Sequence, residues 1–198
     1  MRFPLPILAL ALACAPSDSR PPTSDLFGRP LGSPLARPDF TLTATDGQPF
    51  NFRERTSGKL TLLFFGFTNC PDICPVHAAN IAAVYRTLSW ENRQRTQFVF
   101  VTTDPERDSL SAIRKWLDNF DSTFIGLRGT AEEVGVIQGA LLAAPAVLTE
   151  KQRDGSYDVM HYAAVYAVEP DDSIRVVYPF GVRQEHWAAD IPKLLGRK

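Results

Sequence analysis

The chain has 198 residues, a length that suits one domain with additional terminal sequence. Hydrophobic residues make up 44% of it and charged residues 22%, which is typical of a globular protein with an ordinary core. The formal net charge of −1 excludes a basic field for nucleic acid, and three cysteines are too few for a disulfide framework.

The first 14 residues have the pattern of an export signal. Arg2 is followed by an apolar stretch at 5–13, which is far shorter than the roughly 20 residues of a membrane-spanning helix. Small residues lead directly into Cys14, as in a bacterial lipoprotein signal whose cysteine becomes the lipidated N-terminus, although Ala11 stands where leucine is usual. We expect an exported protein, anchored through Cys14 to the outer, periplasmic face of the bacterial cytoplasmic membrane. An ordinary secretory signal is the alternative.

Residues 15–37 are rich in proline and serine and have little apolar periodicity. Such a segment cannot bury enough apolar surface to offset its chain entropy. We therefore expect a tether over 15–37 that joins the lipidated end to a folded domain over 38–198.

From residue 38 onward the sequence alternates between strand and helix patterns. Asp46 and Gly47 form a hairpin turn signal. Asp108 can cap the helix that follows it, and Thr130 with Glu133 forms a capping-box pattern. Continuous apolar runs mark buried strands, and apolar residues spaced three and four apart mark helices. In chain order we expect a hairpin over 40–52, a strand over 60–67, a helix over 74–88, a strand over 98–103, a helix over 110–117, a strand over 124–127, a helix over 130–137, a hairpin over 162–180 and a helix over 185–195.

The resulting order, βα-βα-βα-ββα, predicts the fold class. It is typical of an α/β protein with a thioredoxin-like fold, in which helices flank a central mixed sheet. Functional sites in α/β sheets favour the carboxyl ends of strands. Cys70 and Cys74 follow such an end, where the first central strand meets its helix.

The two cysteines could lock a loop, shuttle electrons, attack a substrate or bind a metal. Residues i and i+4 of a helical turn lie on one face, so the sulfurs of Cys70 and Cys74 can converge on one point. A helix N-terminus favours the thiolate, and a disulfide is feasible near the upper limit of the allowed Cα separation. Pro71 and Pro75 on an exposed turn argue against two simply buried cysteines or a static disulfide.

A histidine stands where a thioredoxin would carry its cis-proline. The stretch 159–168 contains no proline but has His161 at about that place. A histidine opposite two thiolates gives a set of three ligands, which suits copper(I) and also zinc. Structural zinc generally has four protein ligands, and a fourth is not obvious in this sequence.

Other candidate ligands have simpler interpretations. Met160 is a conceivable extra ligand, but successive strand residues point to opposite faces, and we expect it in the core. His77 is expected at the surface, and His186 at the surface or as a helix cap.

Several blocks in order resemble the SCO/SenC family. They are "LTLLFFGFTNCPDICP" from residue 60, "FVFVTTDPERDS" from residue 98, "FIGLRGT" from residue 124, and His161 followed by "AAVYAVEPDDSIRVVYPFG". The resemblance implies a thioredoxin-fold, membrane-tethered copper protein that delivers copper to the binuclear copper centre of cytochrome c oxidase. Some members act there as thiol reductants. The implied partners are the copper-site subunit of the oxidase, a thioredoxin-like reductase and an upstream copper donor.

The resemblance also assigns roles to individual residues. Cys70, Cys74 and His161 match the family's three ligands for a copper ion, as Cu(I) or Cu(II). Asp104 matches an acidic residue near the site that is tied to metal transfer, and its alternative is a turn or helix-start residue. Asn69 departs from the family, because histidine is frequent at its position.

Three functions remain open from the sequence. The first is a copper metallochaperone, a carrier and not a turnover enzyme. The second is a thiol–disulfide oxidoreductase that uses Cys70 and Cys74 as its redox couple and keeps the cysteines of the oxidase copper site reduced. The third is a peroxiredoxin, but Thr68 lies only two residues before Cys70 and no proline precedes it in the loop, unlike that family's pattern.

Overall fold

The computed structural model describes residues 25–152 and 156–196. The expected signal segment, Cys14 and the first part of the expected tether lie outside the described residues. Within the described ranges, no helix has the length and apolar character that crossing a membrane requires.

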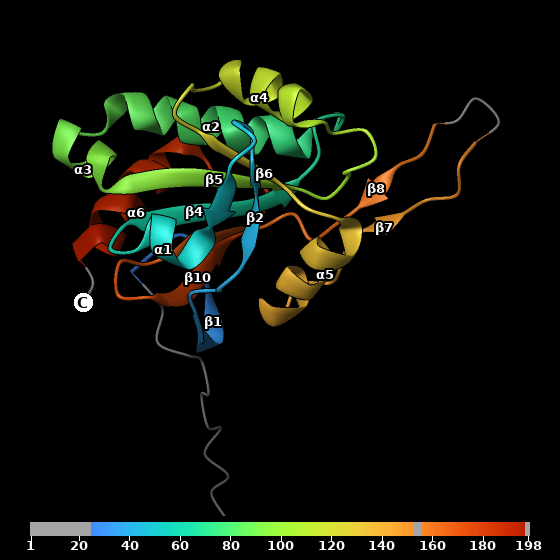
Figure 1. The fold of residues 1–198 in the computed structure, drawn as a ribbon. Helices are drawn as coiled ribbons and strands as arrows, with labels where there is room; N and C mark the ends of the chain where they lie inside the picture. Colours follow the sequence, from blue (N-terminus) through green and yellow to red (C-terminus); the bar gives the residue numbers. More distant parts are fainter. Residues whose placement is uncertain (1–24, 153–155, 197–198) are drawn as a thin grey trace, which may run out of the picture.

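The centre of the molecule is an eight-stranded mixed sheet in the order β1-β10-β9-β4-β5-β6-β2-β3 (Figure 1). Strand β4 pairs parallel with β5 and antiparallel with β9, and β5 pairs parallel with β6. A separate small hairpin, β7 with β8, projects from this body (Figure 1). The strands are β1 (Arg29–Ala36), β2 (Thr41–Ala44), β3 (Pro49–Asn51), β4 (Leu60–Gly66), β5 (Thr96–Thr102), β6 (Ile125–Arg128), β7 (Val147–Leu148), β8 (Val159–Met160), β9 (Val165–Val168) and β10 (Ser173–Tyr178).

Six helices cover the two faces of the sheet in the described residues. They are α1 (Phe52–Thr56), α2 (Ile73–Thr87), α3 (Trp90–Gln94), α4 (Leu110–Asp118), α5 (Ala131–Ala140) and α6 (Gln184–Gly196). Alternation along β4 divides the core, because neighbouring strand residues face opposite sides. Leu62 and Phe64 pack in the cluster under α2, α4 and α6, whereas Leu63 and Phe65 pack in the cluster with α1 and α5. The predicted α/β thioredoxin-like fold with a central mixed sheet is confirmed.

Part of the expected tether belongs to the folded body. Strand β1 pairs antiparallel with β10 at one edge of the sheet, a position that tolerates proline. Arg37 is 1% exposed, and its guanidinium donates to backbone carbonyls of neighbouring segments. Leu26 is buried, and the carboxylate of Asp190 accepts the backbone N–H of Phe27 at 2.7 Å. The tether boundary at residue 37 is therefore wrong, because backbone pairing and burial join this segment to the domain.

Two of the three turn and helix-cap signals in the sequence correspond to the structure. The hairpin turn at Asp46-Gly47 and the capping box of Thr130 and Glu133 are confirmed. Asp108 does not cap α4, because the side chain of Ser109 accepts from the N–H of Ala112 in that role. The short elements α1, α3, β7 and β8 were not predicted.

Candidate metal centre

The two thiols lie where β4 ends and α2 begins. Asp72 caps α2, and its side chain accepts the N–H of Ile73 at 2.6 Å. Cys70 is half-buried in the loop, while Cys74 is fully buried in the first turn of the helix, and both are free cysteines. The N–H of Cys74 donates to the Sγ of Cys70 at 3.4 Å, so the helical turn brings the two cysteines into contact.

His161 reaches the same place from the loop between β8 and β9. Its Nε2 lies 3.7 Å from the Sγ of Cys74, and its Nδ1 lies 3.4 Å from the carbonyl oxygen of Tyr162. Since the carbonyl can only accept, Nδ1 carries the proton and the lone pair of Nε2 faces the sulfur. The rings of Phe64 and Phe67 pack edge-on against the imidazole, with centroid distances of 6.2 and 5.7 Å. The structure thus brings all three expected ligands together.

The two thiols have different acidities. Hydrogen bonding from Cys74 lowers the pKa of Cys70 to about 5, with smaller contributions from backbone N–H groups and the nearby His161. The same hydrogen bond, together with burial, raises the pKa of Cys74. Burial lowers the pKa of His161, which favours the neutral imidazole. At neutral pH the site therefore holds one thiolate, one thiol and one neutral imidazole.

Two residues outside the expected ligand set shape the thiol site: Asp108 bonds to the thiol loop, and Gly66 leaves space for the buried thiol. Asp108 is fully buried and accepts from the N–H of Thr68 at 3.0 Å, its hydroxyl at 2.5 Å, and the hydroxyl of Thr102 at 2.6 Å. Gly66 lies directly beneath the second thiol, because a Cβ there would be 2.9 Å from the Sγ of Cys74. Sequence reasoning missed the role of Asp108, although its place near the carboxyl end of β5 was an available signal.

Asp104 is buried and reaches the centre through other side chains. It is 1% exposed, accepts from the hydroxyl of Tyr157 at 2.7 Å, and forms a close ion pair with the Nε of Arg107. The guanidinium of Arg107 lies 5.8 Å from the ring centroid of Phe67, which packs on His161. Asp104 thus connects to the histidine by way of a cation and an aromatic ring.

Two expectations about neighbouring residues are wrong. His77 is 2% exposed and not at the surface, because its Nε2 lies 3.2 Å from the carbonyl oxygen of Ala163 and its ring packs on Phe64. Met160 is 63% exposed and not in the core, because β8 belongs to the projecting hairpin and not to the central sheet.

The donor set fits a soft metal ion that accepts three ligands. Thiolate and imidazole suit copper(I), and also zinc. Bonds of about 2.0–2.3 Å to one ion leave two ligand atoms about 3.5–4 Å apart, which matches the 3.7 Å between Cys74 and His161. Among the described residues, no three His, Cys, Asp or Glu side chains are already gathered as a closed metal site. Binding would therefore require the three side chains to close around the ion.

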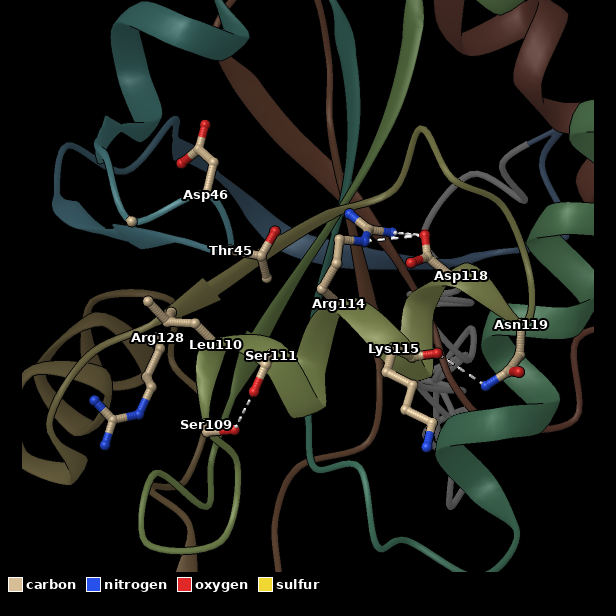
Figure 2. A pocket seen from close by; sticks show the side chains of 11 residues that line it. Thr45, Asp46, Ser109, Leu110, Ser111, Arg114, Lys115, Asp118, Asn119 and Arg128 are labelled. Atoms are coloured by element: carbon tan, nitrogen blue, oxygen red, sulfur yellow. Dashed lines mark hydrogen bonds and ion pairs between the residues drawn. The ribbon is translucent and has the colours of Figure 1, made fainter.

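The open depression beside α4 lacks this chemistry. An open depression of about 990 Å³ lies between α4 and the turn that joins β2 to β3, and no cysteine or histidine lines it (Figure 2). Two of its arginines are already engaged with a neighbouring side chain or with the backbone. Arg114 pairs with Asp118 at 3.0 Å, and Arg128 donates to the carbonyl of Asp108 at 3.1 Å. The thiol and imidazole cluster is therefore the better candidate for the functional site.

Comparisons with known proteins identify the family. The SCO1/SenC family model matches residues 29–196. A Stutzerimonas stutzeri protein whose name describes it as copper-binding is 34% identical over 85% of this chain and 83% of its own length. The apo Sco1 solution structure from Thermus thermophilus has a TM-score of 0.76 and 29% identity, covering 86% of this chain and 97% of that one.

Three further matches come from a bacterium and from mitochondria. Bradyrhizobium japonicum ScoI, solved with copper bound, has a TM-score of 0.71 and 28% identity, covering 81% of this chain and 99% of that one. The chain spans about half the length of the mitochondrial SCO2 proteins it matches, 49% of the zebrafish protein and 52% of the mouse protein. The chain belongs to the SCO1/SenC family.

Proposed function

We propose that this chain is a copper metallochaperone for cytochrome c oxidase assembly, which delivers copper to the binuclear copper centre of a terminal oxidase. The observation that carries the proposal is the approach of His161 to the thiol pair, with its Nε2 3.7 Å from the Sγ of Cys74. The copper-binding name of the Stutzerimonas stutzeri relative and the copper-bound ScoI structure support the choice of metal.

The three ligands have distinct roles in this proposal. Cys70 is the first donor, because its lowered pKa of about 5 makes it a thiolate at neutral pH and it is half-exposed. Cys74 is the second donor and gives up its proton as it binds. His161 is the third donor through the lone pair of Nε2, since Nδ1 donates to the carbonyl of Tyr162.

Asp104 is proposed as an accessory residue that acts through its neighbours. Its ion pair with Arg107 and its hydrogen bond from Tyr157 hold the guanidinium above the ring of Phe67. The same ring packs on His161, so the position of the third ligand depends on this chain of contacts.

A thiol–disulfide oxidoreductase is the second candidate, favoured by the unequal acidity of the two thiols. The Cys70 thiolate would attack an acceptor disulfide and form a mixed disulfide, releasing one acceptor thiolate. Cys74, after losing its proton, would then attack Cys70 and release the second. The acceptor gains two electrons, the Cys70–Cys74 pair loses them, and a partner thioredoxin-like reductase would restore the dithiol.

The proposed location is the outer face of the bacterial cytoplasmic membrane, with Cys14 as the lipidated N-terminus. One acyl chain binds membranes only marginally, so stable anchoring needs at least two, which lipoprotein processing supplies. Mass spectrometry of the mature protein tests this: an unmodified N-terminus at residue 15 or later would contradict it. The proposed partners remain the copper-site subunit of the oxidase, the thioredoxin-like reductase and an upstream copper donor.

The His161→Ala variant separates the two candidate functions. A copper carrier loses affinity for copper(I) when its third ligand is removed, whereas a dithiol reductase has no need of that imidazole as a ligand. We expect the variant to bind copper(I) more weakly while still reducing a disulfide substrate. Unchanged copper(I) affinity in the variant would contradict the proposed carrier function.

A further inference from the structure

We propose that His77 is a positioning residue that holds the loop carrying His161 against the helix carrying Cys74. This inference rests on the proposed copper site, but the contact itself belongs to the metal-free protein. His77 lies one turn beyond Cys74 on α2, and its Nε2 is 3.2 Å from the carbonyl oxygen of Ala163, two residues beyond His161. One hydrogen bond therefore joins the two ligand-bearing segments.

The geometry makes His77 the donor in this bond. A backbone carbonyl can only accept, so Nε2 carries a proton and donates it to this bond. The side chain is 2% exposed, which excludes a competing bond from bulk water and makes an unpaired donor costly at this position. Burial lowers the pKa of His77 to about 4, so the ring is neutral at pH 7.

The backbone of the loop that His77 holds is not part of a strand ladder. Residues 161–164 belong to neither β8 nor β9, so no ladder of backbone hydrogen bonds fixes them. The ring of His77 also packs on Phe64 at 5.0 Å, and the ring of His161 packs on the same phenylalanine at 6.2 Å. Phe64 is fully buried in β4. Both imidazoles therefore pack against the same buried side chain.

Phe180 also packs on His77. Its ring is 51% exposed and lies 5.9 Å from the His77 ring in an edge-to-face contact. His77 thus contacts one core ring and one surface ring, and its Nε2–H is directed at the loop. Its hydrogen bond therefore acts on the loop's position, and the residue need not contact the metal itself.

Two variants separate the hydrogen bond from the packing. His77→Leu keeps a buried apolar side chain but removes the donor, whereas His77→Gln places an amide N–H near the position of Nε2. In the full-length, reduced, metal-free protein, we expect the leucine variant to accelerate amide hydrogen exchange by about tenfold at Val165 and Tyr166, the first residues of the paired strand β9 that follows the loop, and the glutamine variant to remain near wild type. Unchanged exchange in the leucine variant would overturn the inference.

Copper(I) affinity supplies the second readout, measured by competition with a chromophoric copper(I) chelator. Loss of a partner that orients a ligand typically lowers metal affinity by about 10–100-fold, and we expect a loss in that range for His77→Leu. Because His77 acts through His161, the same substitution should cause no further loss in a His161→Ala background. An equal loss in both backgrounds would show a general structural effect and overturn the inference.

The outcomes remain decisive if a variant misfolds or the copper site is wrong. Should His77→Leu fail to fold, His77→Asn replaces it, because its shorter amide is polar but falls short of Ala163. The asparagine variant must then differ from the glutamine variant in exchange, and equal rates would overturn the inference. Should the wild type bind no copper, the proposed function fails, while the exchange measurement still decides whether His77 holds the loop.

Discussion

The Nε2 of His161 lies 3.7 Å from the Sγ of Cys74, although 87 residues separate them in the chain. The pairing of β4 with β9 produces this proximity, because Phe64 is opposite Val165 in the antiparallel register. Strand β4 leads into the thiol loop, and the loop that carries His161 leads into β9. A soft-metal site thus results from one strand pairing at the centre of the sheet.

Copper(I) binding should release about one proton per ion at pH 7. The lowered pKa of Cys70, about 5, makes it a thiolate already, and the lowered pKa of His161 leaves that ring neutral. Only Cys74, whose pKa is raised, then gives up a proton on binding. Affinity should rise about tenfold per pH unit between about pH 6 and 8.

Calorimetry in buffers of different ionisation enthalpy, or affinity measured across this pH range, checks the number of protons. Release of two protons at pH 7 would mean that Cys70 is protonated, contrary to its expected acidity.

Gly66→Ala should disturb the buried thiol. The added Cβ would lie 2.9 Å from the Sγ of Cys74, so the sulfur or the strand must shift. Overpacking of this kind costs about 1–3 kcal/mol, and copper(I) affinity should fall as well. The control is Gly139→Ala in α5, where nothing lies within 4 Å and alanine should stabilise the helix by about 0.5–1 kcal/mol. Equal effects of the two substitutions on the urea midpoint would contradict the close approach at Cys74.

The residues that sequence reasoning predicted well are those with local signals. The continuous apolar run of β4 and the three- and four-residue spacing in α2 correspond to the observed elements. Cys70 and Cys74 could be expected to approach one another, because four residues span about one helical turn. His161 was found through its order in the chain and the family resemblance, since no local pattern indicates that it faces the thiols.

The residues that were misassigned depend on contacts with distant segments. The proline-rich strand β1 resembles a tether until its pairing with β10 is known. His77 is buried because the loop at Ala163 covers it, and Met160 is exposed because its hairpin projects from the sheet. Asp108 resembles a helix cap, but its acceptor oxygens serve Thr68, 40 residues earlier in the chain.

Asp108→Ala should destabilise the domain and loosen the thiol loop. The substitution leaves three donors without their acceptor, namely the N–H and hydroxyl of Thr68 and the hydroxyl of Thr102. Buried unpaired groups cost about 1–3 kcal/mol each, and partial rehydration should limit the total loss to about 3 kcal/mol. Asp118→Ala, at a half-exposed acid on α4, should change stability by less than about 1 kcal/mol. Equal urea midpoints for the two variants would contradict this role of Asp108.

Oxidation should switch the site off. A Cys70–Cys74 disulfide removes both thiolates at once, so the oxidised protein should bind copper(I) far more weakly than the reduced protein at equal pH. The four-residue spacing is near the limit of relaxed disulfide geometry, so the bond should be readily reducible. The Cys70→Ser, Cys74→Ser double variant sets the baseline, because it has no thiol pair to oxidise and should bind copper(I) equally weakly with and without oxidant. Equal affinities of the oxidised and reduced wild type would contradict joint coordination by the two sulfurs.

A copper(I) titration of the reduced full-length protein and of its Cys70→Ser, Cys74→Ser double variant, against a competing chelator, is the decisive test of the proposed copper site. We expect one tightly bound copper ion per chain in the wild type and no tight binding in the double variant, because both thiolates are ligands. A double variant that still binds copper(I) with unchanged affinity would contradict this expectation and would locate the copper site elsewhere in the chain.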